Sequence, residues 1–126
     1  MSMMEYYETA DQLRRAEQAK QDEANAAEFI RERVDPRERL AQLAEEAIEL
    51  AHAALKLRRA MGGSNPTPVA PEDAFAQVKE EIADVTLLVR LLYLDTNPTE
   101  MEEIHRRKLL RWRDRLLKAS EAQKDV

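Results

Sequence analysis

Two acidic clusters lie next to strongly apolar stretches of this sequence. The downstream cluster holds Glu81 and Asp84 and is followed by the apolar run 85–94. On a helix, residues three apart share a face, so both carboxylates would lie in line with leucines that need a partner helix. Two carboxylates about 5 Å apart repel by roughly 3 kcal/mol at an effective dielectric constant near 20. We therefore expect a cation beside this pair, because burial without one is costly.

The upstream cluster contains Glu45, Glu46 and Glu49, of which the last two share a helix face. Alone it fits a solvated surface, because it lies opposite the apolar arc of its helix. The two clusters together are more specific, since two helices packed side by side would bring four carboxylates to one place. Oxygen-only ligands of this kind suit Mg²⁺ or Mn²⁺. The sequence thus predicts a divalent metal site formed by Glu46, Glu49, Glu81 and Asp84.

Composition limits the class of protein. The 126 residues suit a single domain; 36% of them are charged, 5% are aromatic and two are glycine, which is typical of a helical protein with a charged surface. The net charge of −5 argues against stable nucleic-acid binding. The absence of cysteine excludes disulfides, thiol nucleophiles and zinc–thiolate sites. No apolar segment has the length of a signal-peptide core or a membrane span, so we expect no membrane association and a cytoplasmic location.

Apolar spacing and helix boundary signals predict an all-α fold. Asp35-Pro36 and Asn97-Pro98 each place a capping side chain before a proline, which marks a helix start. Gly62-Gly63 ends the first of these helices, and a loop with three prolines follows. The segment before Asp35 favours helix but has a thin apolar stripe, so it either crosses a partner subunit or is partly disordered. The expected helices span about 2–33, 36–61, 71 to Leu94 or Asp95, and 98–119.

The predicted fourth helix carries one apolar stripe that includes Trp112, which we expect in a core. Lys108, Arg111 and Arg115 run along the edge of this stripe. They are either ordinary flanking charges or ligands for phosphate oxygens near the acidic site. Asn65, in the proline-rich loop, either caps a turn or contacts a substrate. The residues alone leave both questions open.

Two Glu-x-x-His motifs support a competing metal site. They are Glu49–His52 and Glu102–His105. Two such motifs, with one glutamate from each of two further helices, form a di-iron carboxylate bundle. The motif is short and arises easily by chance in a glutamate-rich chain, and the third helix offers two acids where one is needed. The di-iron bundle is therefore the second enzymatic interpretation.

The order of the acidic residues resembles a known family. Glu45-Glu46-x-x-Glu49, followed by Glu81-x-x-Asp84, resembles the EExxE…ExxD motif of MazG-like, all-alpha nucleoside triphosphate pyrophosphohydrolases. The resemblance covers about residues 37–117, and the gap between the two halves is at the long end for the family. It implies an all-α bundle of about four helices that is completed by oligomerisation. The implied domains are an N-terminal helical arm at 1–34, a catalytic domain at 35–119 and a frayed tail at 120–126.

The resemblance also implies an activity, which is the Mg²⁺-dependent hydrolysis of a (d)NTP to a (d)NMP and pyrophosphate. By similarity, Mg²⁺ or Mn²⁺ would bridge phosphate oxygens, and Glu45 would activate the attacking water or hold a further ion. The implied metal ligands are Glu46, Glu49, Glu81 and Asp84. The implied catalytic residues are Glu45 and Lys108, and the implied substrate-binding residues are Asn65, Lys108, Arg111 and Arg115.

The expected partners are a nucleoside triphosphate substrate and further copies of the chain, as a homodimer or homotetramer. Housecleaning of the nucleotide pool fits such an activity, although the sequence determines neither the base and sugar preference nor the choice between canonical and damaged nucleotides.

A second class of function is also consistent with the sequence. In it the chain is a non-catalytic helical oligomerisation module whose acids form a solvated or regulatory face, and neither divalent binding nor nucleotide turnover is expected.

Overall fold

The computed structural model describes residues 1–93 and 96–124 and is all-helical, as predicted. Helices account for 87% of these residues, and no strand occurs among them. None of the described helices combines the length and the apolar character that a membrane crossing needs. The helices are α1 (Met3–Arg33), α2 (Pro36–Ala60), α3 (Pro71–Tyr93) and α4 (Pro98–Lys124). The predicted end of the third helix at Leu94 or Asp95 lies outside the described residues.

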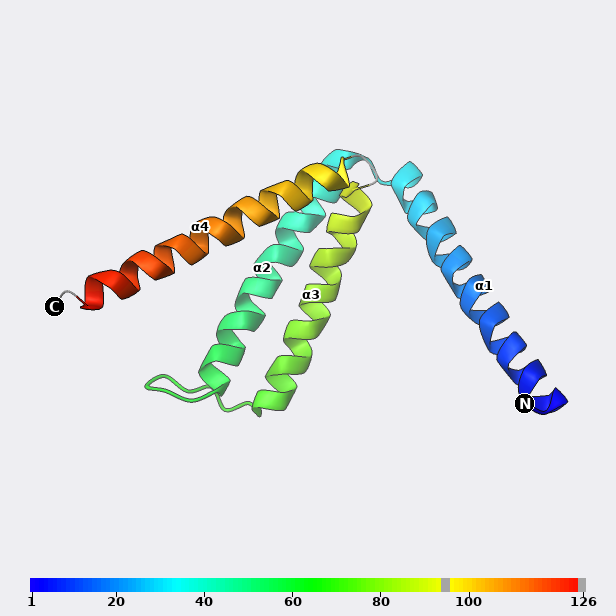
Figure 1. Ribbon diagram of the computed structural model, residues 1–126, viewed down its shortest axis with the longest axis horizontal. Helices are drawn as coiled ribbons and strands as arrows, with labels where there is room; N and C mark the ends of the chain where they lie inside the picture. The colour runs from blue at the N-terminus through cyan, green and yellow to red at the C-terminus, as the bar shows by residue number, and fades with distance from the viewer. Residues whose placement is uncertain (94–95, 125–126) are drawn as a thin grey trace. The chain divides into compact units, whose positions relative to one another are not determined.

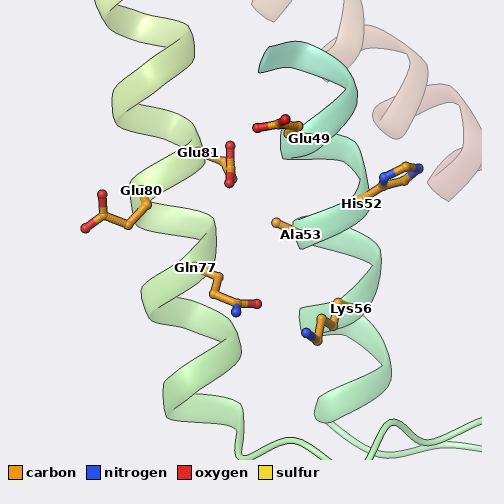
Figure 2. Close-up of a pocket in the computed structure, with 7 residues that line it drawn as sticks. All are labelled: Glu49, His52, Ala53, Lys56, Gln77, Glu80 and Glu81. Atoms are coloured by element: carbon orange, nitrogen blue, oxygen red, sulfur yellow. The ribbon is translucent and has the colours of Figure 1, made fainter. Parts of the chain in front are cut away.

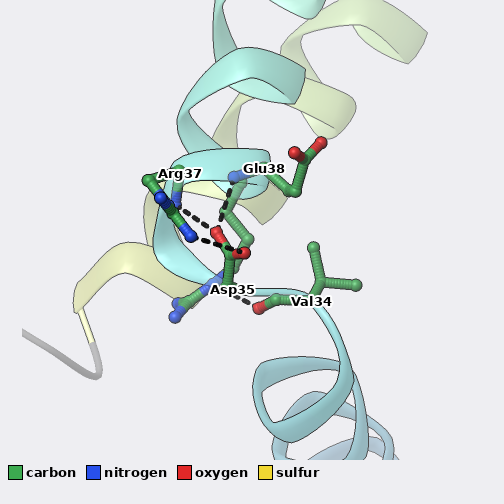
Figure 3. Close-up of polar contacts among 5 residues, drawn as sticks. Val34, Asp35, Arg37 and Glu38 are labelled. Carbon is green, nitrogen blue, oxygen red and sulfur yellow. Dashed lines mark hydrogen bonds and ion pairs between the residues drawn. The ribbon is translucent and has the colours of Figure 1, made fainter.

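The predicted capping residues begin α2 and α4. The Asp35 carboxylate accepts hydrogen bonds from the backbone N–H groups of Arg37 and Glu38, at 2.8 and 3.1 Å (Figure 3). Asn97 accepts one from the Thr99 N–H at 3.0 Å. In both cases a side-chain oxygen satisfies donors that have no partner within the helix, and the proline that follows has no N–H to satisfy.

The end of α2 is set by two glycines, as the sequence predicts. Met61 is the C-cap residue, and Gly62 and Gly63 follow with φ angles of +100° and +118°. This left-handed backbone is readily adopted only by glycine, so the chain can leave the helix sharply here. The loop 61–70 then returns the chain to the start of α3.

The chain divides into two compact units, Met1–Leu92 and Tyr93–Val126. In the first unit, α2 and α3 run side by side in opposite directions, joined by the loop at one end (Figure 1). The contact between them is built largely from small and branched side chains. The buried apolar residues of the described chain are Ala53, Ala74, Val78, Leu88 and Leu91.

Arg39 is the buried charged residue of this unit, with 2% of its surface exposed. Its guanidinium donates to the Val34 carbonyl at 3.2 Å and to the Leu91 carbonyl at 2.9 Å. The first carbonyl belongs to the connection between α1 and α2, and the second lies in the last turn of α3. Cations are favoured where helix carbonyls lack intrahelical partners. Arg39 therefore ties the start of α2 to both neighbouring segments.

The first segment forms one continuous helix, α1, without a buried residue. Its start is a capping box, in which Ser2 accepts from the Glu5 N–H at 3.1 Å and Glu5 accepts from the Ser2 N–H at 2.6 Å. Local pairs such as Asp11–Arg15, at 2.9 Å, add to helix stability. Glu23 forms an ion pair with Arg90 of α3. Capping and polar side-chain pairs thus support a helix that has little apolar surface to bury.

The second unit consists mainly of α4, which also has no buried residue. The expectation that Trp112 is part of a core is wrong for this unit, because 60% of its surface is exposed. Among the described residues of this unit, no second helix covers the apolar stripe of α4, and Leu109 and Leu116 of the same stripe are exposed as well. The helix continues to Lys124, so most of the segment expected to fray is helical.

Candidate metal centre

The antiparallel arrangement of α2 and α3 brings the two acidic clusters together. Glu46, Glu49 and Ala53 share the face of α2 that lies against α3, since they are spaced by three and four residues. On α3, Glu81 and Asp84 continue the face that begins with the buried Ala74. Small alanines at the contact let the two backbones approach each other. The acids therefore face one another across the helix pair, as predicted.

Three carboxylates converge at one point, and we call Glu46, Glu81 and Asp84 the acidic triad. Each offers one oxygen, and these three oxygens all lie within 4.8 Å of one another. Glu46 and Glu81 are half-buried, while Asp84 is exposed. Three oxygen ligands at this separation fit a hard divalent cation that fills its remaining positions with water or substrate oxygens.

Each of the two half-buried members of the triad has one buried carboxylate oxygen without a hydrogen-bond partner among the described residues. The Oε1 atom of Glu46 accepts a hydrogen bond from Gln42 Nε2 at 2.9 Å, which fixes the orientation of the carboxylate. Its Oε2 atom and the Oε2 atom of Glu81 are buried and have no hydrogen-bond partner among the described residues. A buried carboxylate oxygen without a partner is unfavourable. A cation bound between them would remove this cost.

Glu49 lies beside the triad without belonging to it. Its side chain is exposed, and the negative charge of Glu46, followed by that of Glu81, raises the pKa of its carboxyl. This direction is expected for like charges in close proximity, because each disfavours the ionisation of the next. The structure thus joins three of the four predicted metal ligands directly, and places the fourth in the same electrostatic field.

The centre is more open than the sequence suggested. The apolar run 85–94 led us to expect burial around the downstream acids, but Ile82 and Leu87 of α3 are 46% and 50% exposed, and Asp84 is exposed too. The reason is that α2 is the main cover that α3 has within its unit. The expected burial therefore holds in part for Glu46 and Glu81 and fails for Asp84 in one copy of the chain.

The other predicted site residues are not members of the triad. Glu45 is exposed on α2 and is not a member of the triad. Asn65 is exposed in the loop, where it lines a separate hollow with Arg58 and Arg59 at the end of α2. The remaining three residues are exposed on α4, in the second unit, and their roles stay predictions; they are Lys108, Arg111 and Arg115.

A groove of about 480 Å³ extends from the triad between α2 and α3. Figure 2 shows Glu49 and Glu81 at one end of it, and the side chains of Lys56 and Gln77 directed into it from opposite helices at the other. We call it the α2–α3 groove. Its lining residues are Glu49, His52, Ala53, Lys56, Gln77, Glu80 and Glu81.

The ring of His52 lies on the side of α2 that faces away from α3, while the Glu49 carboxylate is directed toward α3 (Figure 2). The Glu49–His52 motif therefore does not direct two ligands toward the same position. A di-iron centre needs both residues of such a motif at the metal. The orientation of His52 thus argues against the di-iron interpretation.

Sequence reasoning missed three polar residues at this site. Gln42 positions Glu46, and Lys56 and Gln77 line the groove. Helical spacing would have found them, because Gln42 precedes Glu46 by four residues, Gln77 precedes Glu81 by four, and Lys56 follows Glu49 by seven. Residues at these separations share a helix face.

Comparisons of the chain with known protein families, with curated proteins and with solved structures found no match.

Proposed function

We propose that this chain is a divalent-metal-dependent nucleoside triphosphate pyrophosphohydrolase, which converts a (d)NTP to a (d)NMP and pyrophosphate. The observation that carries the proposal is the convergence of the acidic triad, with two buried carboxylate oxygens that lack partners. The order of the acids along the chain, Glu45-Glu46-x-x-Glu49 before Glu81-x-x-Asp84, supports it through its resemblance to MazG-like enzymes.

The residues fit this chemistry in distinct roles. Glu46, Glu81 and Asp84 would hold Mg²⁺ or Mn²⁺, with Glu49 as a further ligand. A divalent ion supplies charge neutralisation at phosphate oxygens and fixes their orientation. Glu45, which is exposed and precedes Glu46 in the sequence, is proposed to accept a proton from the attacking water. The proposed phosphate and substrate contacts are Asn65, Lys108, Arg111 and Arg115, of which Lys108 also assists catalysis.

The test is product analysis with a panel of canonical and modified ribo- and deoxynucleoside triphosphates. We expect at least one of them to yield monophosphate and pyrophosphate with Mg²⁺ or Mn²⁺, and none to react in EDTA. Release of orthophosphate and a diphosphate would point to a different bond. No turnover of any nucleotide would favour the non-catalytic oligomerisation module. The panel also identifies the preferred base and sugar.

We further propose that the active form is a homodimer or homotetramer in the cytoplasm. Large apolar side chains on α2 and α3 are about half exposed, among them Ile48, Leu55, Ile82 and Leu87. Exposed apolar area of this extent on adjacent helices is typical of association surfaces. A second copy packed there would also bury more of the acidic site.

This assembly can be measured by size-exclusion chromatography with light scattering. We expect a mass of at least twice 14.6 kDa for the parent chain, and a shift toward monomer in Ile82→Glu, because a charge at a buried contact opposes association. The control is Ser64→Glu in the loop 61–70, which adds the same charge at an exposed position outside both helices and should keep the parent's mass. A parent that elutes as a monomer at micromolar concentration would contradict the proposal.

A further inference from the structure

The Lys56 side chain occupies an unusual position in the α2–α3 groove. It is half-buried and is directed toward α3, below the acids (Figure 2). Glu49, Ala53 and Lys56 share one face of α2, so the lysine lies on the same side as the acids but two helical turns further along. In the described chain, neither its ammonium nor the Gln77 amide opposite forms a hydrogen bond or an ion pair.

The charges along the groove change sign. Glu49 and Glu81 lie at the end next to the triad, and the positively charged side chain of Lys56 lines the other end (Figure 2). Once a divalent cation is bound by the triad, the groove offers two cationic groups, the metal ion and the Lys56 ammonium, separated by a polar amide. A ligand that fits must carry negative charge beside both groups, and an extended polyphosphate has this property. Ammonium groups bind phosphate oxygens through charge-assisted hydrogen bonds.

We propose that Lys56, with Gln77, binds the terminal phosphate of the substrate and so selects triphosphates over diphosphates. The inference rests on the proposed function, because the metal site and the cleavage between the α and β phosphates come from it. Lys56 would hold the part of the substrate that leaves as pyrophosphate, at the end of the groove remote from the triad. Gln77 would donate its amide N–H to the same phosphate group. The nucleoside would extend from the opposite side of the metal site.

The test compares the parent with Lys56→Met, which keeps most of the length of the side chain but removes its charge. With Mg²⁺ present, we expect the Kd for inorganic tripolyphosphate, measured by calorimetry, to rise about tenfold or more. The KM for the preferred triphosphate should rise by a similar factor, while the KM for the corresponding diphosphate changes little. Lys56→Arg should recover much of the affinity, because it keeps the charge.

The control is Lys79→Met. Lys79 is an exposed lysine of α3 that lies over the Phe75 ring, 4.7 Å from its centroid, and does not line the groove. Lys79→Met changes the net charge by the same amount as Lys56→Met, so an equal effect of the two substitutions would overturn the inference. An effect of Lys56→Met that followed the base instead of the number of phosphates would also overturn it. If the parent hydrolyses no nucleotide, the proposed function fails, and tripolyphosphate binding still decides whether Lys56 is a phosphate ligand.

Discussion

The Glu81→Gln variant is expected to lose pyrophosphate release by about 100-fold or more relative to the parent, since a divalent ion contributes several kcal/mol to phosphoryl-transfer transition states. Glutamine keeps the shape of the side chain but binds a hard cation weakly. Glu81 is the residue to change because it is half-buried and its Oε2 atom has no hydrogen-bond partner within the described chain. Steady-state kinetics at saturating Mg²⁺ measure the effect.

The same variant should fold at least as well as the parent in EDTA. Removing one charge from the group formed by Glu46, Glu49 and Glu81 relieves the like-charge repulsion that raises the pKa of Glu49. Glu72→Gln is the matched control, because Glu72 is an exposed glutamate of the same helix that belongs neither to the triad nor to the groove lining. Equal losses of activity in both variants would show that the triad has no special role.

Replacing Arg39 with methionine is expected to lower the free energy of unfolding by about 2–4 kcal/mol, because it removes the donor from two largely buried carbonyls at about 1–3 kcal/mol each. Val34 and Leu91 provide these carbonyls, at 3.2 and 2.9 Å from the guanidinium. Methionine fills much of the same volume, so the loss reflects polar contacts more than packing. Urea unfolding at one fixed protein concentration measures the change, since assembly would also affect stability.

Arg37→Met provides the comparison for this prediction. Arg37 lies on the same first turn of α2, but its side chain is 91% exposed and its ion pair with Asp35 is 3.7 Å long. Exposed pairs of this kind contribute less than about 1 kcal/mol. If Arg39→Met and Arg37→Met unfold at the same urea concentration, Arg39 does not join the three segments in the way we infer.

Local rules predicted much of this structure. The N-caps at Asp35 and Asn97 and the stop at Gly62-Gly63 appear where the sequence placed them, because each depends on a few neighbouring residues. The meeting of Glu46 with Glu81 and Asp84 followed from helical spacing and from the side-by-side packing of α2 and α3, which the loop 61–70 joins. These features need no knowledge of distant contacts.

Features that depend on which surfaces meet were harder to predict. Trp112 belongs to an apolar stripe, but the stripe on α4 does not reveal what covers it. In the sequence, Arg39 is one of several charged residues near the start of α2. Its burial depends on the positions of two carbonyl groups that only the folded chain brings together. Lys56 likewise became notable once α3 supplied the opposite wall of the groove.

Titration of the metal-free chain with Mg²⁺ tests the central claim most directly, because it asks whether the acidic triad binds a divalent cation. We predict a saturable heat signal and a rise in stability of about 2.7 kcal/mol at 100 times the Kd. Both should disappear in Asp84→Asn and persist in Asp73→Asn, which changes an exposed aspartate in the first turn of α3. Equal Mg²⁺ binding by these two variants, or no binding by the parent, would contradict the account.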